Sequence, residues 1–152
     1  MCTVTCVIKK DEVLLTSNRD VPEDRPHSLP PRVYNKSGFF FAMPLDPQGG
    51  GSWIGTNGVI TICLLNHSGK YDSDKSRGRL VLNLLSRKTD IYKIDEDSKH
   101  YNPFRLIYIN REMQKYKLFT WDGFEVETEA IDKKSNIWIS KNIYSENEIS
   151  SK

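Results

Sequence analysis

The feature that most constrains the fold is a nearly continuous apolar run from Val59 to Leu65. A strand with one face in solvent alternates polar and apolar residues, whereas an unbroken apolar run of this length is typical of a strand covered on both faces. A chain of 152 residues fits one domain, because a single core of that size buries roughly two-thirds of the unfolded surface. We therefore expect a single layered domain over residues 1–152.

The other elements predict an α+β fold. Apolar and β-branched stretches predict strands at residues 39–43, 104–109, 116–121, 124–129 and 137–140, with a two-residue hairpin turn at Asp122-Gly123. Residues 76–85 place apolar side chains at helical offsets, with Ser76 as the N-cap. We expect antiparallel sheets with helices packed outside them.

Three segments carry no clear periodicity. Residues 21–31 contain four prolines, which remove backbone donors, so we expect a loop. Residues 90–102 are polar and predict irregular structure with at most a short helix. The last dozen residues predict a loose tail.

Residues 3–8 and 13–16 predict a short β-hairpin. Both stretches are rich in β-branched and apolar residues, and four charged residues separate them. In an antiparallel pair, the start of the first strand lies opposite the end of the second. We therefore expect Cys2 to lie close to Asn18-Arg19-Asp20, and Cys2 and Cys6 to share one face of their strand.

Cys2 is a candidate nucleophile. Removal of Met1 would leave a free α-amine beside the thiol, and an amine with a pKa of about 7.7 to 8.0 is partly neutral near pH 7 and can accept the thiol proton. In this interpretation Arg19 favours the thiolate and Asp20 orients the amine. Alternatively, Cys2 is a small buried residue at the start of a strand, and the charged segment forms a surface ion pair.

The triple glycine Gly49 to Gly51 predicts a close backbone approach beside the site, because glycine reaches conformations closed to other residues. It lacks the Lys-Ser/Thr of a phosphate-binding loop, which argues against nucleotide binding. Trp53 fits a core residue better than a stacking platform. Since no paired cysteine or histidine spacing typical of metal ligands occurs, we expect neither metal nor cofactor.

The composition of the chain limits the kinds of binding partner that we expect. The 22 basic and 20 acidic residues are spread along the chain without the basic stripe of a nucleic-acid footprint. No apolar run approaches the roughly 18 residues of a membrane span. The first residues lack the pattern of a secretory signal, and three cysteines indicate free thiols in a reducing compartment. We expect a cytoplasmic protein with a small-molecule ligand; no pattern predicts its oligomeric state.

Several motifs occur together in a characteristic order and spacing. They are Cys2, Asn18-Arg19-Asp20, Arg25-Pro26, the segment DPQGGGSWIG at residues 46–55, Leu65-Asn66, and Ser76-Arg77-Gly78 followed by Leu80-Val81. From Met1 to about Leu85 the sequence thereby resembles the NRDE family, also called transport and Golgi organisation protein 2-like. This family is distantly related to the choloylglycine and penicillin acylases.

The resemblance implies an N-terminal nucleophile hydrolase-like fold, a four-layer αββα sandwich of antiparallel sheets. Because family members are usually longer, this chain would be compact or truncated in its C-terminal half. The resemblance also implies that Cys2 is the nucleophile, that Asp20 lies against the new N-terminus, and that Asn66 lies where the acylases place an oxyanion-hole asparagine. Asn66 on its own also fits a turn residue at a strand end.

For a hydrolase that acts on a small amide, we predict two groups of site residues. The catalytic group consists of Cys2, Arg19, Asp20 and Asn66. The substrate-binding group consists of Asn18, Gly51, Trp53 and His67.

Two further functions stay open. A family member without the reaction could handle haem or an acyl lipid, or take part in secretory or Golgi organisation. The short C-terminal half and Val21, which stands where the family motif ends in Glu, motivate this alternative. The second further function is that of a protein-interaction domain in which Cys2 has only a structural role.

Overall fold

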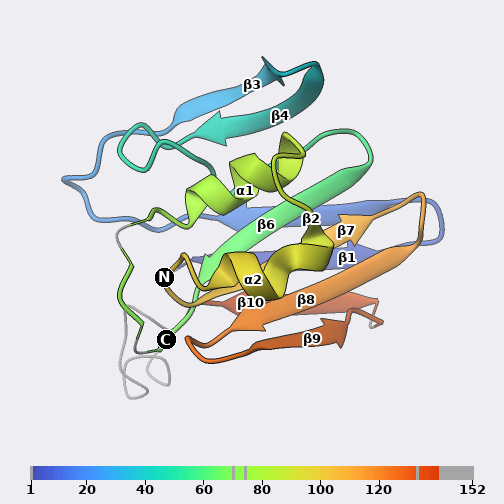
Figure 1. Ribbon diagram of the computed structural model, residues 1–152. Helices are drawn as coiled ribbons and strands as arrows, with labels where there is room; N and C mark the ends of the chain where they lie inside the picture. Colours follow the sequence, from blue (N-terminus) through green and yellow to red (C-terminus); the bar gives the residue numbers. More distant parts are fainter. Residues whose placement is uncertain (1, 70, 74, 133, 141–152) are drawn as a thin grey trace.

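The computed structural model describes residues 2–69, 71–73, 75–132 and 134–140, and it folds into two antiparallel sheets with short helices on one side (Figure 1). The larger sheet contains β3 (Leu29–Lys36), β4 (Phe39–Leu45), β5 (Ile54–Thr56), β6 (Ile60–Asn66), β7 (Phe104–Asn110), β8 (Lys115–Trp121) and β9 (Val126–Ala130), in that order. The smaller sheet contains β10 (Ser135–Ile139), β1 (Thr3–Ile8) and β2 (Val13–Asn18), in that order. The helices are α1 (Gly78–Leu85), the 3-10 turn η1 (Ile91–Lys93) and α2 (Ile94–Ser98).

β6 is the covered strand that the sequence predicts. Ile62 and Leu64 point to the helical side of the large sheet and are buried there. Cys63 and Leu65 alternate with them and are buried on the other side, toward the small sheet. The period of two along a strand places successive side chains in different layers, so both layers need apolar residues from β6.

Two apolar layers hold the molecule together. In the first, Leu80, Leu84 and Leu85 of α1 pack on the large sheet, together with η1 and α2. In the second, Val4 and Cys6 of β1 pack against the opposite face of the same sheet. Figure 1 shows this order, with α1 and α2 on one side of the large sheet and β1, β2 and β10 on the other. The predicted α+β class and antiparallel sandwich are confirmed, and the described residues contribute the helical layer on the large-sheet side.

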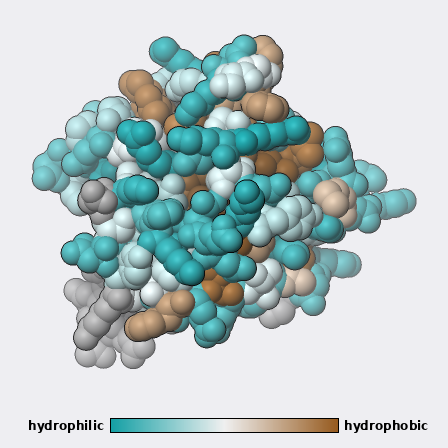
Figure 2. Space-filling view, in the orientation of Figure 1, coloured by the Kyte–Doolittle hydropathy of each residue, from teal (hydrophilic) through white to brown (hydrophobic). Residues whose placement is uncertain are grey.

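The helical face carries mainly hydrophilic side chains toward solvent, with apolar residues gathered in small patches (Figure 2). Within the described residues, no helix is long and apolar enough to cross a membrane.

The small sheet places Cys2 at its edge. β1 and β2 pair in the predicted hairpin register, with Thr3 opposite Asn18. β10 pairs with the other side of β1, with Thr3 opposite Ile139. Cys2 therefore lies between the residues that follow β2 and those that follow β10.

The prediction of a loop through residue 31 is wrong, because β3 begins at Leu29 and includes Pro30 and Pro31. β3 forms the outer edge of the large sheet, where proline costs no ladder hydrogen bond on the solvent side. The pairing with β4 shifts its register between Leu29 and Arg32, where the prolines lie. The short strand β5 was not predicted either.

Two local predictions also need correction. Helix α1 begins at Gly78 with Arg77 at its N-cap and no side-chain cap bond, so Ser76 does not cap it. The turn between β8 and β9 spans residues 122–125, because the Asp122 carboxylate accepts hydrogen bonds from the N–H groups of Phe124 and Glu125 and pairing resumes only at Val126. The short helices η1 and α2 occupy the polar segment 90–102. The predicted tail lies outside the described residues.

Candidate active site

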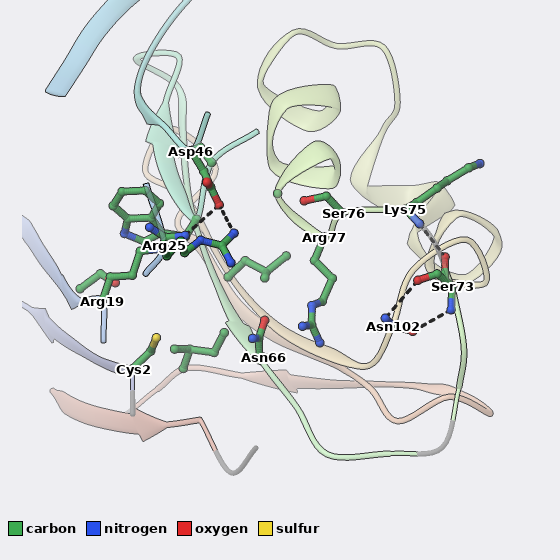
Figure 3. A pocket seen from close by; sticks show the side chains of 16 residues that line it. Cys2, Arg19, Arg25, Asp46, Asn66, Ser73, Lys75, Ser76, Arg77 and Asn102 are labelled. Atoms are coloured by element: carbon green, nitrogen blue, oxygen red, sulfur yellow. Dashed lines mark hydrogen bonds and ion pairs between the residues drawn. The ribbon is translucent and has the colours of Figure 1, made fainter. Parts of the chain in front are cut away.

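A polar cavity of about 350 Å³ lies at the edge of the two sheets. Cys2, the residues after β2 and the end of β6 form one part of its wall, and the segment leading into α1 forms the opposite part (Figure 3). The topology brings these segments together because β1, β2 and β6 all have the relevant end at this edge. The cavity therefore collects residues from distant parts of the sequence.

Cys2 lines this cavity and is half-buried. Its backbone N–H donates a hydrogen bond of 3.1 Å to the Ser140 hydroxyl, and its carbonyl accepts one of 2.9 Å from the Ser140 N–H. Its thiol lies 3.5 Å from the backbone carbonyl of Asp20, to which it donates. The main chain of Cys2 is thus fixed by β10, and its sulfur by the segment after β2.

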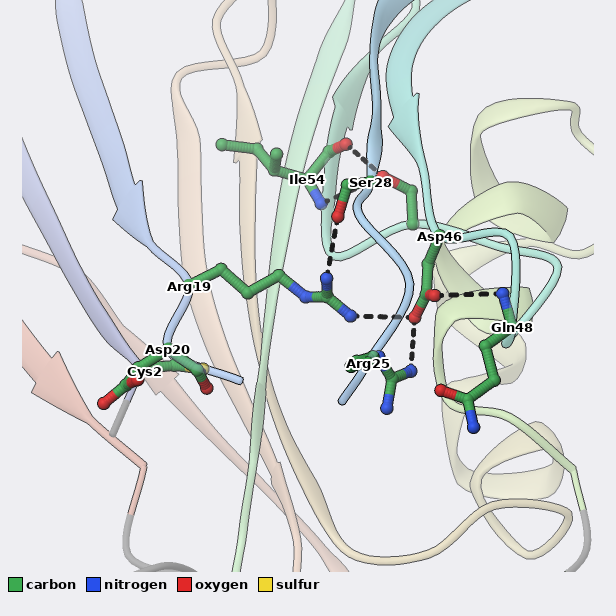
Figure 4. A network of polar contacts seen from close by, with 9 residues as sticks. Cys2, Arg19, Asp20, Arg25, Ser28, Asp46, Gln48 and Ile54 are labelled. Carbon is green, nitrogen blue, oxygen red and sulfur yellow. Dashed lines mark hydrogen bonds and ion pairs between the residues drawn. The ribbon is translucent and has the colours of Figure 1, made fainter. Parts of the chain in front are cut away.

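The segment Asn18-Arg19-Asp20 reaches Cys2 as predicted, but its side chains diverge. Ser17 and Arg19 line the cavity, whereas Asn18 is exposed and is not among the lining residues. Asp20 contacts Cys2 through its carbonyl oxygen, and its side chain is exposed (Figure 4). The orienting role of its carboxylate stays a prediction.

Arg19 is held by a buried carboxylate. One oxygen of Asp46 accepts hydrogen bonds from Arg19 at 2.8 Å and from Arg25 at 2.5 Å (Figure 4). Arg19 also donates to the Ser28 hydroxyl, and its guanidinium lies 4.4 Å from the ring centre of Trp53. Arg19 is therefore a fixed part of the cavity wall, positioned by ion pairing and by stacking.

The pKa of Asp46 is lower than usual. Burial acts to raise this pKa, but the hydrogen bond from Arg25 and the charges of Arg19 and Arg25 together outweigh it. Backbone N–H groups add to the effect, and the N–H of Gln48 donates to the second carboxylate oxygen. Asp46 is consequently ionised at neutral pH and stabilises two guanidinium groups at once.

Asn66 is the last residue of β6, opposite Phe104, and it lines the cavity with Cys2. Figure 3 shows Asn66 between Cys2 and the side chain of Arg77. Arg77 precedes α1 and donates a 2.9 Å hydrogen bond to the carbonyl of Pro103. An asparagine amide in this place can donate to an oxygen atom of a molecule bound near Cys2.

The other predicted substrate-binding residues lie in three different settings. Trp53 lines the cavity beneath Arg19. Gly51 lies behind the wall, where an added Cβ would be only 2.2 Å from the backbone of Gly78, which confirms the predicted close approach. His67 is not among the residues that line this cavity. Its backbone N–H donates a hydrogen bond to the Pro103 carbonyl.

His67 interacts electrostatically with Asp122. Hydrogen bonds from the N–H groups of Glu125 and Phe124 lower the pKa of Asp122, and the charge of His67 adds a smaller contribution. His67 thus lies near the turn between β8 and β9. Its assignment to substrate binding stays a prediction.

The three cysteines are free thiols in different environments. Cys6 and Cys63 are fully buried between the sheets. Burial raises the pKa of Cys6, and it raises the pKa of Cys63 to about 12, with a small further contribution from nearby Cys2 and opposition from a Ser17 hydrogen bond. Cys2 is the thiol that the cavity makes accessible to a ligand.

Sequence reasoning missed several cavity residues. Asp46, Arg25 and Arg77 lie inside quoted motifs, so the resemblance signalled them, but their roles depend on contacts between segments. Ser140 follows β10, and only the pairing of β10 with β1 brings it to Cys2. Among the described residues, no cluster of His, Cys, Asp and Glu side chains could hold a metal ion.

Comparisons with known proteins place the chain in a family. No curated protein and no solved structure matches it. The family model described as Transport and Golgi organisation 2 matches residues 1–148, nearly the whole length of the chain and far beyond the motifs of its first half. The protein therefore belongs to the Transport and Golgi organisation 2 family.

Proposed function

We propose that the protein is an N-terminal cysteine hydrolase that cleaves a small amide after Met1 has been removed. The observation that carries the proposal is the position of Cys2, whose thiol lines a polar cavity while its own main chain is fixed by Ser140. A nucleophile of this type needs its sulfur at the substrate and its amine in a defined orientation. Both requirements fit the arrangement at the edge of the two sheets.

In the first step the α-amine of Cys2 takes the thiol proton, and the sulfur attacks the amide carbon. The negative charge that develops on the carbonyl oxygen is stabilised by the Asn66 amide, a type of interaction worth about 3 to 4 kcal/mol in the transition state. The proton on the amine passes to the leaving nitrogen as the C–N bond breaks. Cys2 is left as a thioester, and an amine departs.

In the second step water attacks the thioester carbon, and the α-amine of Cys2 accepts a proton from that water. The carboxylic acid leaves, and the thiol is regenerated. Ser140 accepts a hydrogen bond from the Cys2 nitrogen, and the same contact would hold the free amine in place beside the thiol. Ser140 is thereby a positioning residue.

The cavity supports a small and polar substrate. Its volume of about 350 Å³ suits a small molecule, and most of its lining side chains are charged or hydrogen-bonding groups. A haem or an acyl chain would instead need apolar walls. We place the activity in the cytoplasm, because three free thiols are suited to a reducing compartment.

The test needs no knowledge of the substrate. Intact-mass spectrometry of the purified protein first shows whether Met1 is absent. The protein is then treated with 2-cyanobenzothiazole, which condenses only with a residue that carries both a free amine and a free thiol. We expect Met1 to be absent and one adduct to form at Cys2, and no adduct in a Cys2→Ser variant. A chain that keeps Met1 or forms no adduct contradicts the proposal.

A further inference from the structure

The described residues give the cavity an excess of positive charge. Four cationic side chains of this part of the chain line it, namely Arg19, Arg25, Lys75 and Arg77, against the single carboxylate of Asp46. Asp46 is shared by Arg19 and Arg25. Arg77 and Lys75, on the opposite wall, form no ion pair with any carboxylate of the described residues. Among the described residues, the cations without an ion pair therefore lie on the wall that leads into α1.

Arg77 is well placed to bind an anion. Its hydrogen bond to the Pro103 carbonyl uses one N–H and restrains the guanidinium at the cavity wall. A guanidinium carries five N–H donors, so donors remain for a ligand. Burial lowers the pKa of Arg77. A planar fork of N–H donors matches the geometry of a carboxylate or phosphate group.

The described part of the wall around Arg77 is held by hydrogen bonds and includes a neighbouring hydroxyl group. The side chain of Asn102 accepts a 2.9 Å hydrogen bond from the Ser73 N–H and donates one of 3.1 Å to the Ser73 carbonyl. The hydroxyl of Ser76 also lines the cavity, next to Arg77 in sequence (Figure 3). A cation held by a hydrogen bond beside a hydroxyl group is partly preorganised for an anion, which reduces the entropy lost on binding.

We propose that the substrate of this cavity carries an anionic group, a carboxylate or a phosphate, which Arg77 binds while the scissile carbonyl lies between Cys2 and Asn66. The position of the scissile carbonyl rests on the proposed hydrolase function. The binding of an anion by Arg77 does not depend on it. Arg77 selects the substrate, Lys75 adds long-range attraction at the exposed rim, and the Arg19–Asp46–Arg25 group closes the other side. Neutral amides of the same size should bind poorly.

The experiment compares an anionic probe with a neutral probe of nearly the same size and shape. N-Acetylglycine carries an amide and a carboxylate, and N-acetylglycinamide is its neutral counterpart. Both are titrated at constant ionic strength into the Cys2→Ser variant, which prevents turnover, and binding is followed by NMR chemical shifts of backbone amides. We expect N-acetylglycine to bind at least tenfold more tightly, since hydrogen bonds between charged groups are the strong ones.

Second substitutions assign the preference to Arg77. Adding Arg77→Gln should reduce the preference to about twofold or less, and Arg77→Lys should retain part of it. Arg32→Gln on exposed β3 removes the same charge outside the cavity and should leave the preference unchanged. If Arg77→Gln does not fold, Lys75→Gln at the exposed rim should still weaken N-acetylglycine binding about threefold.

Competition then separates the two kinds of anion. Acetate and inorganic phosphate are each titrated against bound N-acetylglycine, and the better competitor identifies the group that the site prefers. Equal binding of the two probes, absence of saturable binding, or an equal loss in Arg32→Gln and Arg77→Gln would each overturn the inference. If N-acetylglycine binds more tightly than N-acetylglycinamide but the protein with Cys2 forms no cyanobenzothiazole adduct, only the hydrolase function is refuted.

Discussion

The layer between the two sheets and the cavity at its edge give two cysteines opposite properties. Cys63 lies inside the layer, fully buried, and burial raises its pKa to about 12. Cys2 lies where β1 begins, beside the cavity and next to polar groups from β2 and β10. The side chains are identical, so the difference comes from position alone. A thiol becomes available for chemistry where the sheets end.

The largest expected effect concerns alkylation. Cys63 should react with iodoacetamide at least about 10³ times more slowly in the folded protein than in urea, because a pKa raised from 9.0 to about 12 lowers its thiolate fraction near pH 8 by that factor. Cys2 should be labelled readily in the folded protein. Peptide mapping by mass spectrometry after timed quenching measures both rates, with Cys2→Ser as the control. Equal labelling of the two residues in the folded state would remove the contrast.

The next largest effect concerns the cavity alone. Under the proposed mechanism, Asn66→Ala should lower kcat for a cleaved amide by about 10² to 10³, because the proposed oxyanion donor would be lost. The free energy of unfolding should change little, since Asn66 ends its strand at the cavity. Asn35→Ala on the exposed edge strand β3 is the matched control and should keep full activity. Similar rates in both variants would show that Asn66 is only a strand-end residue.

A substitution in the layer between the sheets should instead reduce the free energy of unfolding and leave the cavity unchanged. Ile107→Ala removes a fully buried side chain from β7 and should reduce the free energy of unfolding by about 3 kcal/mol. Ile137→Ala is the matched control on β10, where the side chain is 67% exposed, and it should cost less than about 1 kcal/mol. Urea denaturation measures both. The accessibility of Cys2 to iodoacetamide should stay unchanged in each variant.

The smallest effect concerns a cavity residue that also contributes to the stability of the fold. Asp46→Asn should reduce the free energy of unfolding by about 2 kcal/mol at pH 7, because Arg19 and Arg25 lose their common carboxylate. The folded-state pKa of Asp46 is lowered, so its contribution is complete above the ordinary value of 3.8 and disappears as the pH falls through the folded-state value. Urea denaturation at pH 7 and at pH 3 should therefore show a smaller difference between variant and wild type at the lower pH. A constant difference would contradict this assignment.

Part of the site could be read from sequence because it depends on neighbouring strands. The hairpin of β1 and β2 joins Cys2 to the segment after Asn18 through a short turn, so local pairing rules are sufficient. The position of Asn66 followed from the resemblance and from its place at the end of an apolar run. The close approach of the glycine segment was predicted as well, although its partner Gly78 was not.

Other parts depend on contacts that local patterns do not contain. The prolines of β3 argue against a strand unless the strand is known to lie at a sheet edge, and only the complete sheet order shows that. Asp46 meets Arg19 and Arg25 across more than twenty residues, and the chain offers other carboxylates at similar separations. Ser140 reaches Cys2 only because β10 pairs with the outer side of β1.

The sequence by itself determined the covered central strand, the N-terminal hairpin and the position of Cys2 beside it, because strand periodicity and hairpin pairing act over short stretches of chain. The tertiary structure decided which charges meet in the cavity: Asp46 pairs with both Arg19 and Arg25, and Arg77 donates to the Pro103 carbonyl. Side-chain pairing of this kind is set by how the sheets and α1 pack, which no short segment encodes.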